Sequence, residues 1–340
     1  MLDSADIQSL GKELSTPKKI AVLAHVNPDG DAIGSCLALE ICLKARGHQV
    51  HTIAPNRFPN FLYWMEGAPD IIIYKDSPEK TKEILTNTDI VFCLDFNNLE
   101  RLEELGSFVL KLPAKKILID HHPEPNLDGF YMKFCDVESC STAEIVYRLL
   151  LNLKYEDTIS PTVVSVIYVG IMTDTNDFRN NCNNPETFEI IADLIRRGID
   201  KDLIHSKVYD NYSKERLQLL GHALCKKMVV LPEYRAAYIA LSKKELSQFK
   251  SQIGDTEGFV NLPLSIKGVV LSGFFSENPD HIRISFRSKG KFAANELAKT
   301  YFNGGGHKNA AGGKLHTSLD EAINLYKQAL EEYKDDLLDS

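Results

Sequence analysis

The chain has 340 residues, of which 44% are hydrophobic and 25% are charged, and its formal net charge is −8. This length and composition predict a folded protein of about two domains. The longest apolar runs are far too short to span a membrane, and the acidic charge argues against a protein that coats long nucleic acid.

Two further features of the sequence predict a cytoplasmic location. The N-terminal segment MLDSADIQSLGKELSTPKK has no apolar stretch and no cleavage site, so it does not resemble a signal peptide. The seven cysteines include no C-x-x-C pair, which favours free thiols in a reducing compartment.

The first half of the chain alternates short apolar runs with helical patterns. Such alternation predicts an α/β domain with a parallel sheet, in which ligands bind outside the carboxyl ends of the strands. The expected strands are residues 18–24, 48–54, 88–96 and 114–122, and the expected helices are 31–47, 142–153 and 160–175.

The second half predicts a helical connector followed by a smaller α/β domain. The expected strands are residues 234–241, 269–275 and 281–288, the expected helices are 242–250, 291–302 and 319–337, and 304–313 is a glycine-rich loop. We therefore predict a catalytic domain over 1–190, a connector over 191–230 and a substrate-binding domain over 231–340, with the active-site cleft between the two domains.

Acids and imidazoles gather at the ends of the predicted elements of the first domain. Carboxylates that converge on one edge repel each other unless a cation neutralises them, and a mixture of carboxylate and imidazole suits Mn²⁺, Mg²⁺, Fe²⁺ or Zn²⁺. Six such groups exceed the needs of one ion and fit two ions about 3.5–4 Å apart. The six are His25, Asp29, Asp31, Asp95, His121 and Asp174.

Each of these residues also has an ordinary structural explanation. The stretch Asn-Pro-Asp-Gly-Asp at 27–31 is good turn chemistry, and Asp31 can cap the following helix. Asp95 can be a turn residue or a cap, and Asp174 can lie in a helix C-terminal turn. The argument for a metal site is that they occur together at four element ends.

The motifs resemble those of the DHH phosphoesterases. The chain contains H-x-N-P-D-G-D-A-x-G-S at 25–35, an apolar run into Asp95, D-H-H at 120–122 and G-I-x-T-D-T at 170–175, in the order of that family. The glycine-rich G-G-G-H-K-N-A-A-G at 304–312 is similar to the signature of the DHH-associated C-terminal domain. The two-domain size most resembles the branch of nanoRNases and pAp phosphatases.

The resemblance implies two Mn²⁺ sites, or sites for Mg²⁺ or another divalent ion. His25 and Asp29 would hold one ion, while Asp31, His121 and Asp174 would hold the other. Asp95 would bridge them. Asp120 would orient the ligands, and His122 would face the phosphate as a donor or general acid. The chain departs from the family at Asn176, where glycine commonly follows T-D-T.

A basic segment in the second domain predicts an anion-binding face. Residues 281–314 contain seven Lys or Arg and one acid, a net charge of +6, so the remainder of the chain carries −14. Consecutive glycines let backbone N–H groups approach an anion closely, although a glycine run alone also fits a flexible loop. The predicted substrate contacts are Arg287, Lys289, Gly304, Gly305, Gly306, His307, Lys308 and Asn309.

The predicted function is metal-assisted phosphoester hydrolysis by a manganese-dependent phosphodiesterase and phosphatase. Expected partners are short RNA, dinucleotides and pAp, with no long duplex nucleic acid and no membrane, and a homodimer is possible. Hydrolysis of cyclic-di-AMP or a linear dinucleotide is an alternative, inorganic pyrophosphatase activity is disfavoured by the glycine-rich loop, and a non-catalytic nucleotide sensor is an alternative from a different class.

Overall fold

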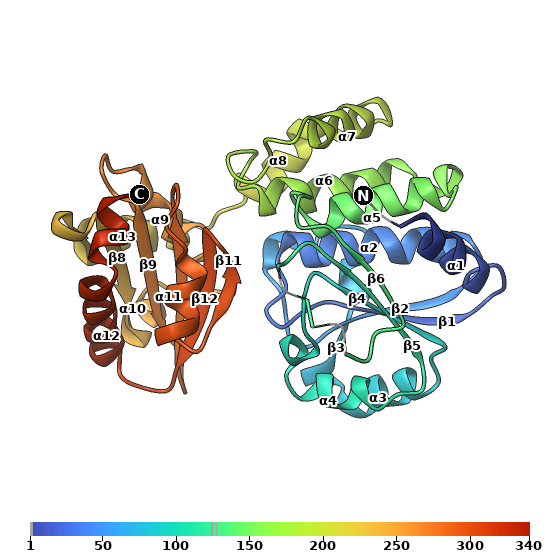
Figure 1. Ribbon diagram of the computed structural model, residues 1–340, viewed down its shortest axis with the longest axis horizontal. Helices are drawn as coiled ribbons and strands as arrows, with labels where there is room; N and C mark the ends of the chain where they lie inside the picture. Colours follow the sequence, from blue (N-terminus) through green and yellow to red (C-terminus); the bar gives the residue numbers. More distant parts are fainter. Residues whose placement is uncertain (1–2, 124, 127) are drawn as a thin grey trace. The chain divides into compact units, whose positions relative to one another are not determined.

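The computed structural model describes residues 3–340 except 124 and 127. The chain divides into two compact units, Met1–Asn211 and Tyr212–Ser340, which are called here the first and the second unit. Each unit contains one six-stranded sheet with helices packed against it (Figure 1). The predicted α/β class with two such domains is therefore confirmed, and the predicted boundaries at 190 and 230 stay predictions.

The sheet of the first unit is wholly parallel. Its strand order is β3-β2-β1-β4-β5-β6, so the chain moves outward from β1 to β3 and then returns to place β4 on the other side of β1. The strands are β1 Lys19–Leu23, β2 Gln49–Ala54, β3 Ile72–Ile73, β4 Ile90–Leu94, β5 Lys115–Asp120 and β6 Met132–Cys135.

Continuous apolar runs form the central strands because helices cover both faces of the sheet. All five residues of β4 are buried. Helices α2, α5 and α6 lie on one face, and α3 and α4 lie on the other (Figure 1). The helices of this unit are α1 Ser4–Glu13, α2 Gly30–Ala45, α3 Pro78–Thr86, α4 Glu104–Leu110, α5 Thr142–Asn152, α6 Pro161–Asp174, α7 Pro185–Arg196 and α8 Lys201–Tyr209.

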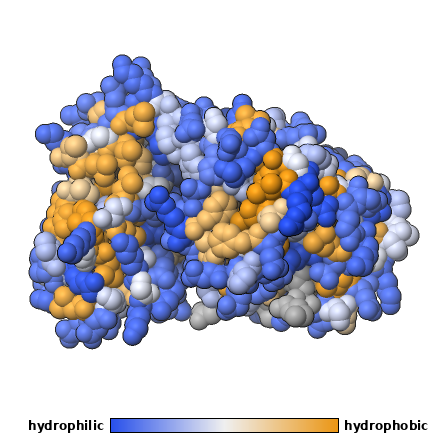
Figure 2. Space-filling view, turned by 90° about the horizontal axis from the view of Figure 1, so that it is seen from above, coloured by the Kyte–Doolittle hydropathy of each residue, from blue (hydrophilic) through white to orange (hydrophobic). Residues whose placement is uncertain are grey.

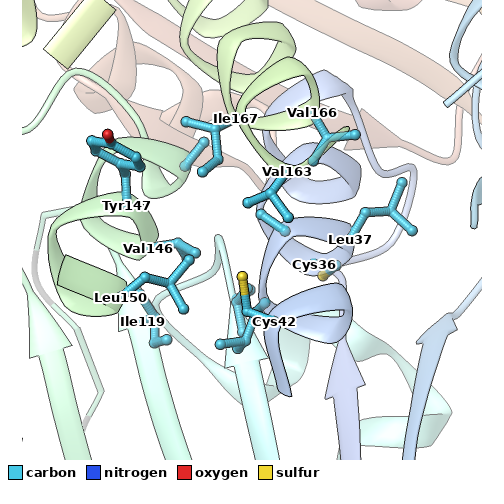
Figure 3. Close-up of a cluster of buried hydrophobic side chains, with 14 of the residues drawn as sticks. Cys36, Leu37, Cys42, Ile119, Val146, Tyr147, Leu150, Val163, Val166 and Ile167 are labelled. Carbon is cyan, nitrogen blue, oxygen red and sulfur yellow. The ribbon is translucent and has the colours of Figure 1, made fainter. Parts of the chain in front are cut away.

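Helices α2, α5 and α6 form a layer on one face of the sheet, and their apolar side chains make up much of the core of the first unit. Figure 3 shows side chains from the three helices meeting above Ile119 of β5. Helices α2 and α6 approach so closely that a Cβ on Gly34 would overlap the carbonyl oxygen of Val166. A Cβ on Gly30, in the first turn of α2, would likewise overlap the side chain of Thr173 in the last turn of α6, so these two glycines let the helices come close.

The second unit contains a mixed sheet. Its order is β11-β12-β10-β9-β8-β7, in which β8 and β9 are parallel and the other neighbours are antiparallel. The strands are β7 Met228–Leu231, β8 Ala236–Leu241, β9 Leu271–Glu277, β10 Ile282–Ser288, β11 Gly305–His307 and β12 Ala310–Leu315.

Residues 304–313 differ from the sequence-based expectation of a loop. They form most of the hairpin β11–β12, whose second strand pairs with β10. Glycine is uncommon in strands. Here the two backbones of the hairpin approach too closely for a Cβ at Gly304 or Gly306, and hydrogen bonds to the neighbouring strands hold the segment in the sheet.

Helices cover the sheet of the second unit on both faces. Phe275 and Phe286 pack against α11 and α12, while Ile239 and Phe274 pack in a separate cluster with α9. The helices are α9 Lys214–His222, α10 Lys243–Gln248, α11 Ala294–Tyr301, α12 Leu319–Glu332 and α13 Lys334–Leu338.

The surface has the mixed polarity of an ordinary folded protein. The face in Figure 2 combines hydrophilic side chains with contiguous groups of apolar ones. Among the described residues, no helix combines the length and the apolar character that crossing a bilayer requires.

The crossing of α2 and α6 gives a stability prediction. Gly34→Ala should lower the free energy of unfolding by about 1–3 kcal/mol, because the added methyl group overlaps the backbone of α6. Gly11→Ala is the matched control, because its Cβ would lie 3.8 Å from Leu153 Cδ2 and alanine favours a helix. Urea unfolding compares the two, and equal stability of both variants would contradict the close crossing.

Candidate metal centre

The candidate site lies where three neighbouring strands end. β4 lies between β1 and β5, and all three run in parallel. His25 follows β1, Asp95 follows β4 directly, and Asp120 ends β5 with His121 next to it. The order of the sheet reverses between β1 and β4, which is the point where ligands bind in open parallel sheets.

The turn between β1 and α2 is fixed by two asparagines and capped by Asp29. Asn27 has a positive φ of 54°, its N–H donates to Asn56 Oδ1 over 2.6 Å, and Asn56 Nδ2 donates back to Asn27 Oδ1 over 2.9 Å. Asp29 Oδ1 accepts from the N–H groups of Asp31 and Ala32. The capping residue is therefore Asp29, and the alternative that Asp31 caps α2 is wrong.

The N-terminus of α5 holds two buried carboxylates. The N–H of Thr142 donates to Asp31 Oδ2 over 2.7 Å, and the N–H of Ala143 donates to Asp31 Oδ1 over 2.9 Å. The Thr142 hydroxyl donates to Asp95 Oδ1 over 3.0 Å. The positive end of a helix favours negative charge at this position. Asp95 itself has a φ of 66°, a left-handed conformation that non-glycine residues seldom adopt.

Two imidazoles present one nitrogen each to these carboxylates. His25 Nδ1 lies 2.8 Å from the Val26 carbonyl oxygen, and His121 Nδ1 lies 3.3 Å from that of Ser139. A carbonyl oxygen only accepts, so Nδ1 carries a proton in both rings, and in the neutral form of such a ring Nε2 has the lone pair.

The Nε2 atoms lie among the carboxylate oxygens. His25 Nε2 is 3.4 Å from Asp95 Oδ2. His121 Nε2 is 3.5 Å from Asp95 Oδ1 and 3.6 Å from Asp174 Oδ2. Asp174, the last residue of α6, thus joins the site although it is far along the chain.

Two of the candidate donor groups contain the predicted metal ligands and share Asp95, which also belongs to a further group with Asp120 and His122. The ligand atoms of His25, Asp29 and Asp95 lie within 4.8 Å of one another, and those of Asp31, Asp95 and His121 do the same. The two groups contain five of the six residues that the sequence indicates, and Asp174 joins them through its 3.6 Å approach to His121 Nε2. The assignment of each to an individual ion stays a prediction.

The electrostatics of the site suit a bound cation. Burial, followed by the charges of neighbouring aspartates, raises the pKa of Asp31 and of Asp95 well above the usual range. Burial lowers the pKa of His25, which keeps its imidazole neutral. A mixture of imidazole nitrogens and crowded carboxylates is a donor set that divalent ions such as Mn²⁺ accept.

Asp120 and His122 form a separate pair beside these groups. His122 Nδ1 lies 2.7 Å from Asp120 Oδ1. Burial opposes ionisation of Asp120, but the hydrogen bond and charge of His122 outweigh it and lower the pKa of this carboxyl. The predicted orienting and phosphate-facing residues are therefore in direct contact with each other.

The segment after Asp174 has an unusual backbone. Asn176, Asp177 and Phe178 all have positive φ, at 50°, 59° and 61°. Asparagine tolerates this conformation better than most residues, which explains how it stands where the family commonly has glycine. The carbonyl oxygen of Thr175 accepts from both Arg179 and Asn180, which closes the turn.

The predicted substrate contacts of the second unit fall on the hairpin and on the end of β10. A Cβ on Gly304 would overlap the carbonyl oxygen of Gly312, and one on Gly306 would lie 2.5 Å from that of Ala310. No described atom lies within 4 Å of a Cβ built on Gly305. Gly304 and Gly306 are thus required by the hairpin, whereas Gly305 leaves space above it.

Two predicted contact residues also have structural roles. Asn309 Nδ2 donates to Ser288 Oγ over 2.8 Å and to the Phe292 carbonyl oxygen over 3.2 Å, which ties the hairpin to the end of β10. Lys289 Nζ donates to the carbonyl oxygen of Leu264. Arg287 lies opposite Ala310 in the sheet, and Lys308 is exposed.

Sequence reasoning did not identify the residues that hold the predicted metal ligands, or the turn that carries them, in place through hydrogen bonds. Thr142 could have been found, because S-T-A-E at 141–144 has the pattern of a helix N-cap and a helix N-terminus binds anions. Ser139 acts through its carbonyl oxygen and Asn56 pairs with a distant asparagine, so neither leaves a local signal.

Comparison with known proteins agrees with this architecture. The N-terminal domain of the DHH family matches residues 19–171, and the DHHA1 domain matches residues 238–332. The crystal structure of an exopolyphosphatase-related protein from Bacteroides fragilis is 44% identical, with a TM-score of 0.93 over 99% of this chain and 98% of that one. The chain belongs to the DHH family, and the family supports phosphoesterase activity.

Two curated relatives are named bifunctional oligoribonuclease and PAP phosphatase NrnA. The protein from Bacillus subtilis is 28% identical over 92% of this chain and 94% of its own length. The protein from Thermus thermophilus is 29% identical over 94% of this chain and 90% of its own length.

The raised pKa values predict how pH affects the metal-free protein. Folded Asp31 and Asp95 bind protons more tightly than the unfolded chain does, so their contribution to stability falls as pH rises above the ordinary aspartate pKa of about 3.9. We expect the loss of Tm between pH 5 and 8, measured in EDTA, to be smaller in Asp95→Asn than in the unsubstituted protein.

Manganese should reverse this loss. At 100 times its Kd, one ion adds about 2.7 kcal/mol to the folded state, and the gain should be largest at pH 8, where it neutralises ionised carboxylates. Equal pH profiles for the variant and the unsubstituted protein would show that Asp95 does not experience the predicted charge crowding.

Proposed function

We propose that this chain is a two-metal phosphoesterase that hydrolyses short oligoribonucleotides and dinucleotides to mononucleotides and removes the 3′-phosphate of pAp. The observation that carries the proposal is the pair of donor groups that share Asp95. Two ions bridged by one carboxylate suit phosphoester hydrolysis, and the names of the NrnA relatives indicate the substrates.

The proposed roles follow the geometry. His25 and Asp29 hold one ion, Asp31, His121 and Asp174 hold the other, and Asp95 contributes to both. When bound, two Mn²⁺ ions supply a water of lowered pKa and neutralise charge on the phosphate. The α5 N-terminus keeps Asp31 and Asp95 in place, so these donors need little rearrangement to bind.

His122 is the proposed proton donor to the substrate. Asp120 Oδ1 accepts a hydrogen bond from His122 Nδ1, and an ionised carboxylate in this position fixes the orientation of the ring. Nε2 can then donate to a phosphate oxygen or to the leaving group. In other enzymes, too, a carboxylate that is hydrogen-bonded to Nδ1 of a catalytic imidazole orients the ring.

The second unit is proposed to bind the substrate. Its basic segment 281–314 attracts phosphate, and the open space above Gly305 admits a close approach of the ligand. Arg287 and Lys308 supply charge, while Lys289, His307 and Asn309 complete the predicted set. The acidic remainder of the chain repels long polymers, which favours substrates of a few nucleotides.

A second candidate activity comes from the Bacteroides fragilis relative. The Bacteroides fragilis protein is described as exopolyphosphatase-related, so the chain is also a candidate for hydrolysis of phosphoanhydrides. Both activities use the same metal site. The nucleotide reading is preferred because the NrnA relatives match over nearly their full length.

A substrate panel tests the proposal. Purified protein with Mn²⁺ is incubated separately with pAp, two-to-five-nucleotide RNA, 24-nucleotide RNA, cyclic-di-AMP, pyrophosphate and tripolyphosphate. We expect mononucleotides from the short RNA and phosphate from pAp, with a lower rate on the 24-nucleotide RNA. His122→Ala should lower kcat by about 10²–10⁴-fold if it donates the proton.

The control is His205→Ala, which removes an imidazole that contacts Tyr168 and Asp177 in the same unit and should keep more activity. Preferential hydrolysis of tripolyphosphate or of cyclic-di-AMP would replace the proposed substrate class. Mn²⁺ binding without turnover of any substrate would leave the nucleotide sensor as the function.

The hairpin gives a separate prediction about substrate binding. Gly305→Ala should fold with unchanged stability, because its Cβ meets open space, and should raise KM for pAp about tenfold by filling the surface that faces the ligand. Gly304→Ala should instead lower Tm, because its Cβ overlaps the backbone of Gly312. An unchanged KM in Gly305→Ala would remove this hairpin from the binding surface.

A further inference from the structure

A partly buried charged cluster packs against the segment that joins β6 to α5. Glu144 and Arg148 are one turn apart on α5, and Asp136 begins the joining segment, residues 136–141. Glu144 has an exposed fraction of 0% and the side chain of Arg148 one of 14%. None of the three belongs to the predicted metal or substrate set.

Arg148 binds the joining segment at two points. Its Nη2 donates to Asp136 Oδ2 over 2.9 Å and also to Ser139 Oγ. The turn between these two residues is closed by the Ser139 N–H, which donates to the Asp136 carbonyl oxygen over 3.1 Å. Arg148 therefore fixes both ends of a tight turn.

The same turn supports His121. The Ser139 carbonyl oxygen accepts from His121 Nδ1, so the position of residue 139 determines which nitrogen of His121 keeps the proton. A shift of this carbonyl would release Nδ1 and let the ring place its proton on Nε2, the atom that faces Asp95 and Asp174.

The next residues of the segment support Asp31. Ser141 Oγ accepts from the Glu144 N–H and so caps α5, and the first N–H groups of that helix bind Asp31. Glu144 Oε2 accepts from Cys140 Sγ over 2.9 Å and from Thr187 Oγ1 over 2.8 Å. Glu144 thus connects the joining segment, through Cys140, to Thr187 of α7.

The energetics argue for a role other than stability. A buried ion pair gains little over well-packed apolar side chains of the same volume, because desolvation cancels most of the attraction. Apolar side chains in place of Arg148 and Asp136 would fill the space but would not fix the orientation of the Ser139 carbonyl.

We propose that Arg148 is a positioning residue for the metal centre: by binding Asp136 and Ser139 it holds the carbonyl that keeps the Nδ1 proton of His121, and so presents Nε2 of His121 to the ion held with Asp31. The inference rests on the proposed two-metal function and names the residue on which one of the two sites depends. Residues that orient a ligating imidazole typically change metal affinity by about 10–100-fold.

Arg148→Met tests the proposal, because methionine keeps an apolar stem and removes the hydrogen bonds. Calorimetric titration of the metal-free protein with Mn²⁺ should show one site weakened by about tenfold or more and the other within about threefold. Arg148→Lys, which keeps the charge, should restore part of the lost affinity.

The matched control is Arg197→Met. Arg197 pairs through Nε with Asp193 Oδ2 over 2.9 Å at the end of α7, and its side chain is 26% exposed. This substitution also breaks a partly buried arginine–aspartate pair, and both Mn²⁺ affinities should stay unchanged.

A spectroscopic measurement separates positioning from a loss of fold. In the metal-free protein with ¹⁵N-labelled histidine, His121, assigned by comparison with His121→Ala, should show the Nδ1–H tautomer, and Arg148→Met should convert it to a mixture. Asp136→Asn, which removes charge from the same hydrogen bond at nearly constant shape, should shift the mixture in the same direction to a smaller extent.

The possible outcomes are distinct. Unchanged Mn²⁺ affinities and an unchanged tautomer in a folded Arg148→Met would overturn the proposal, and so would an equal loss at both sites. If the unsubstituted protein binds two ions and Arg148→Met weakens one, the inference holds even when the substrate panel shows no hydrolysis. If the unsubstituted protein binds no Mn²⁺, both proposals fail.

Discussion

Mutual repulsion among buried carboxylates is the constraint on which the site depends. Asp31 and Asp95 are buried close to each other and to Asp174, and burial together with these neighbours opposes their ionisation. Neutral hydrogen-bond donors of α5 oppose this repulsion: the first backbone N–H groups of the helix bind Asp31, and the Thr142 side-chain hydroxyl binds Asp95. These donors hold the geometry but carry no full charge, so a divalent cation remains the natural counterpart of the cluster.

The fold brings this charge together at low conformational cost. Parallel strands that end side by side at the reversal of strand order deliver His25, Asp95 and His121 to one edge. The close crossing of α2 and α6 adds Asp31 and Asp174, because a Cβ on Gly170 would lie 2.8 Å from Asp31 Oδ1. Small residues where two apolar helices cross therefore shape the candidate metal centre although their side chains have no donor atom.

The sequence predicts the place of a residue well when that residue stands at the end of a strand or helix with a clear hydrophobic pattern. The donors stand at the ends of strongly patterned strands and helices, so the parallel sheet and the grouping of the six residues could be predicted. The support of Asp31 by α5, of His121 by Ser139 and of Asn27 by Asn56 joins residues distant in sequence or uses backbone atoms. Periodicity does not record such contacts, and for the same reason the glycine-rich segment was expected to be a loop and is a hairpin.

The predicted metal donors and the predicted substrate contacts lie in different compact units, which bears on how such proteins diversify. All six predicted metal donors lie in Met1–Asn211, and all eight predicted substrate contacts lie in Tyr212–Ser340. If the proposed roles hold, substitutions in the second unit can alter which anion is recognised while the predicted metal donors of the first unit stay unchanged. New substrate preferences could then arise without loss of the residues proposed for hydrolysis.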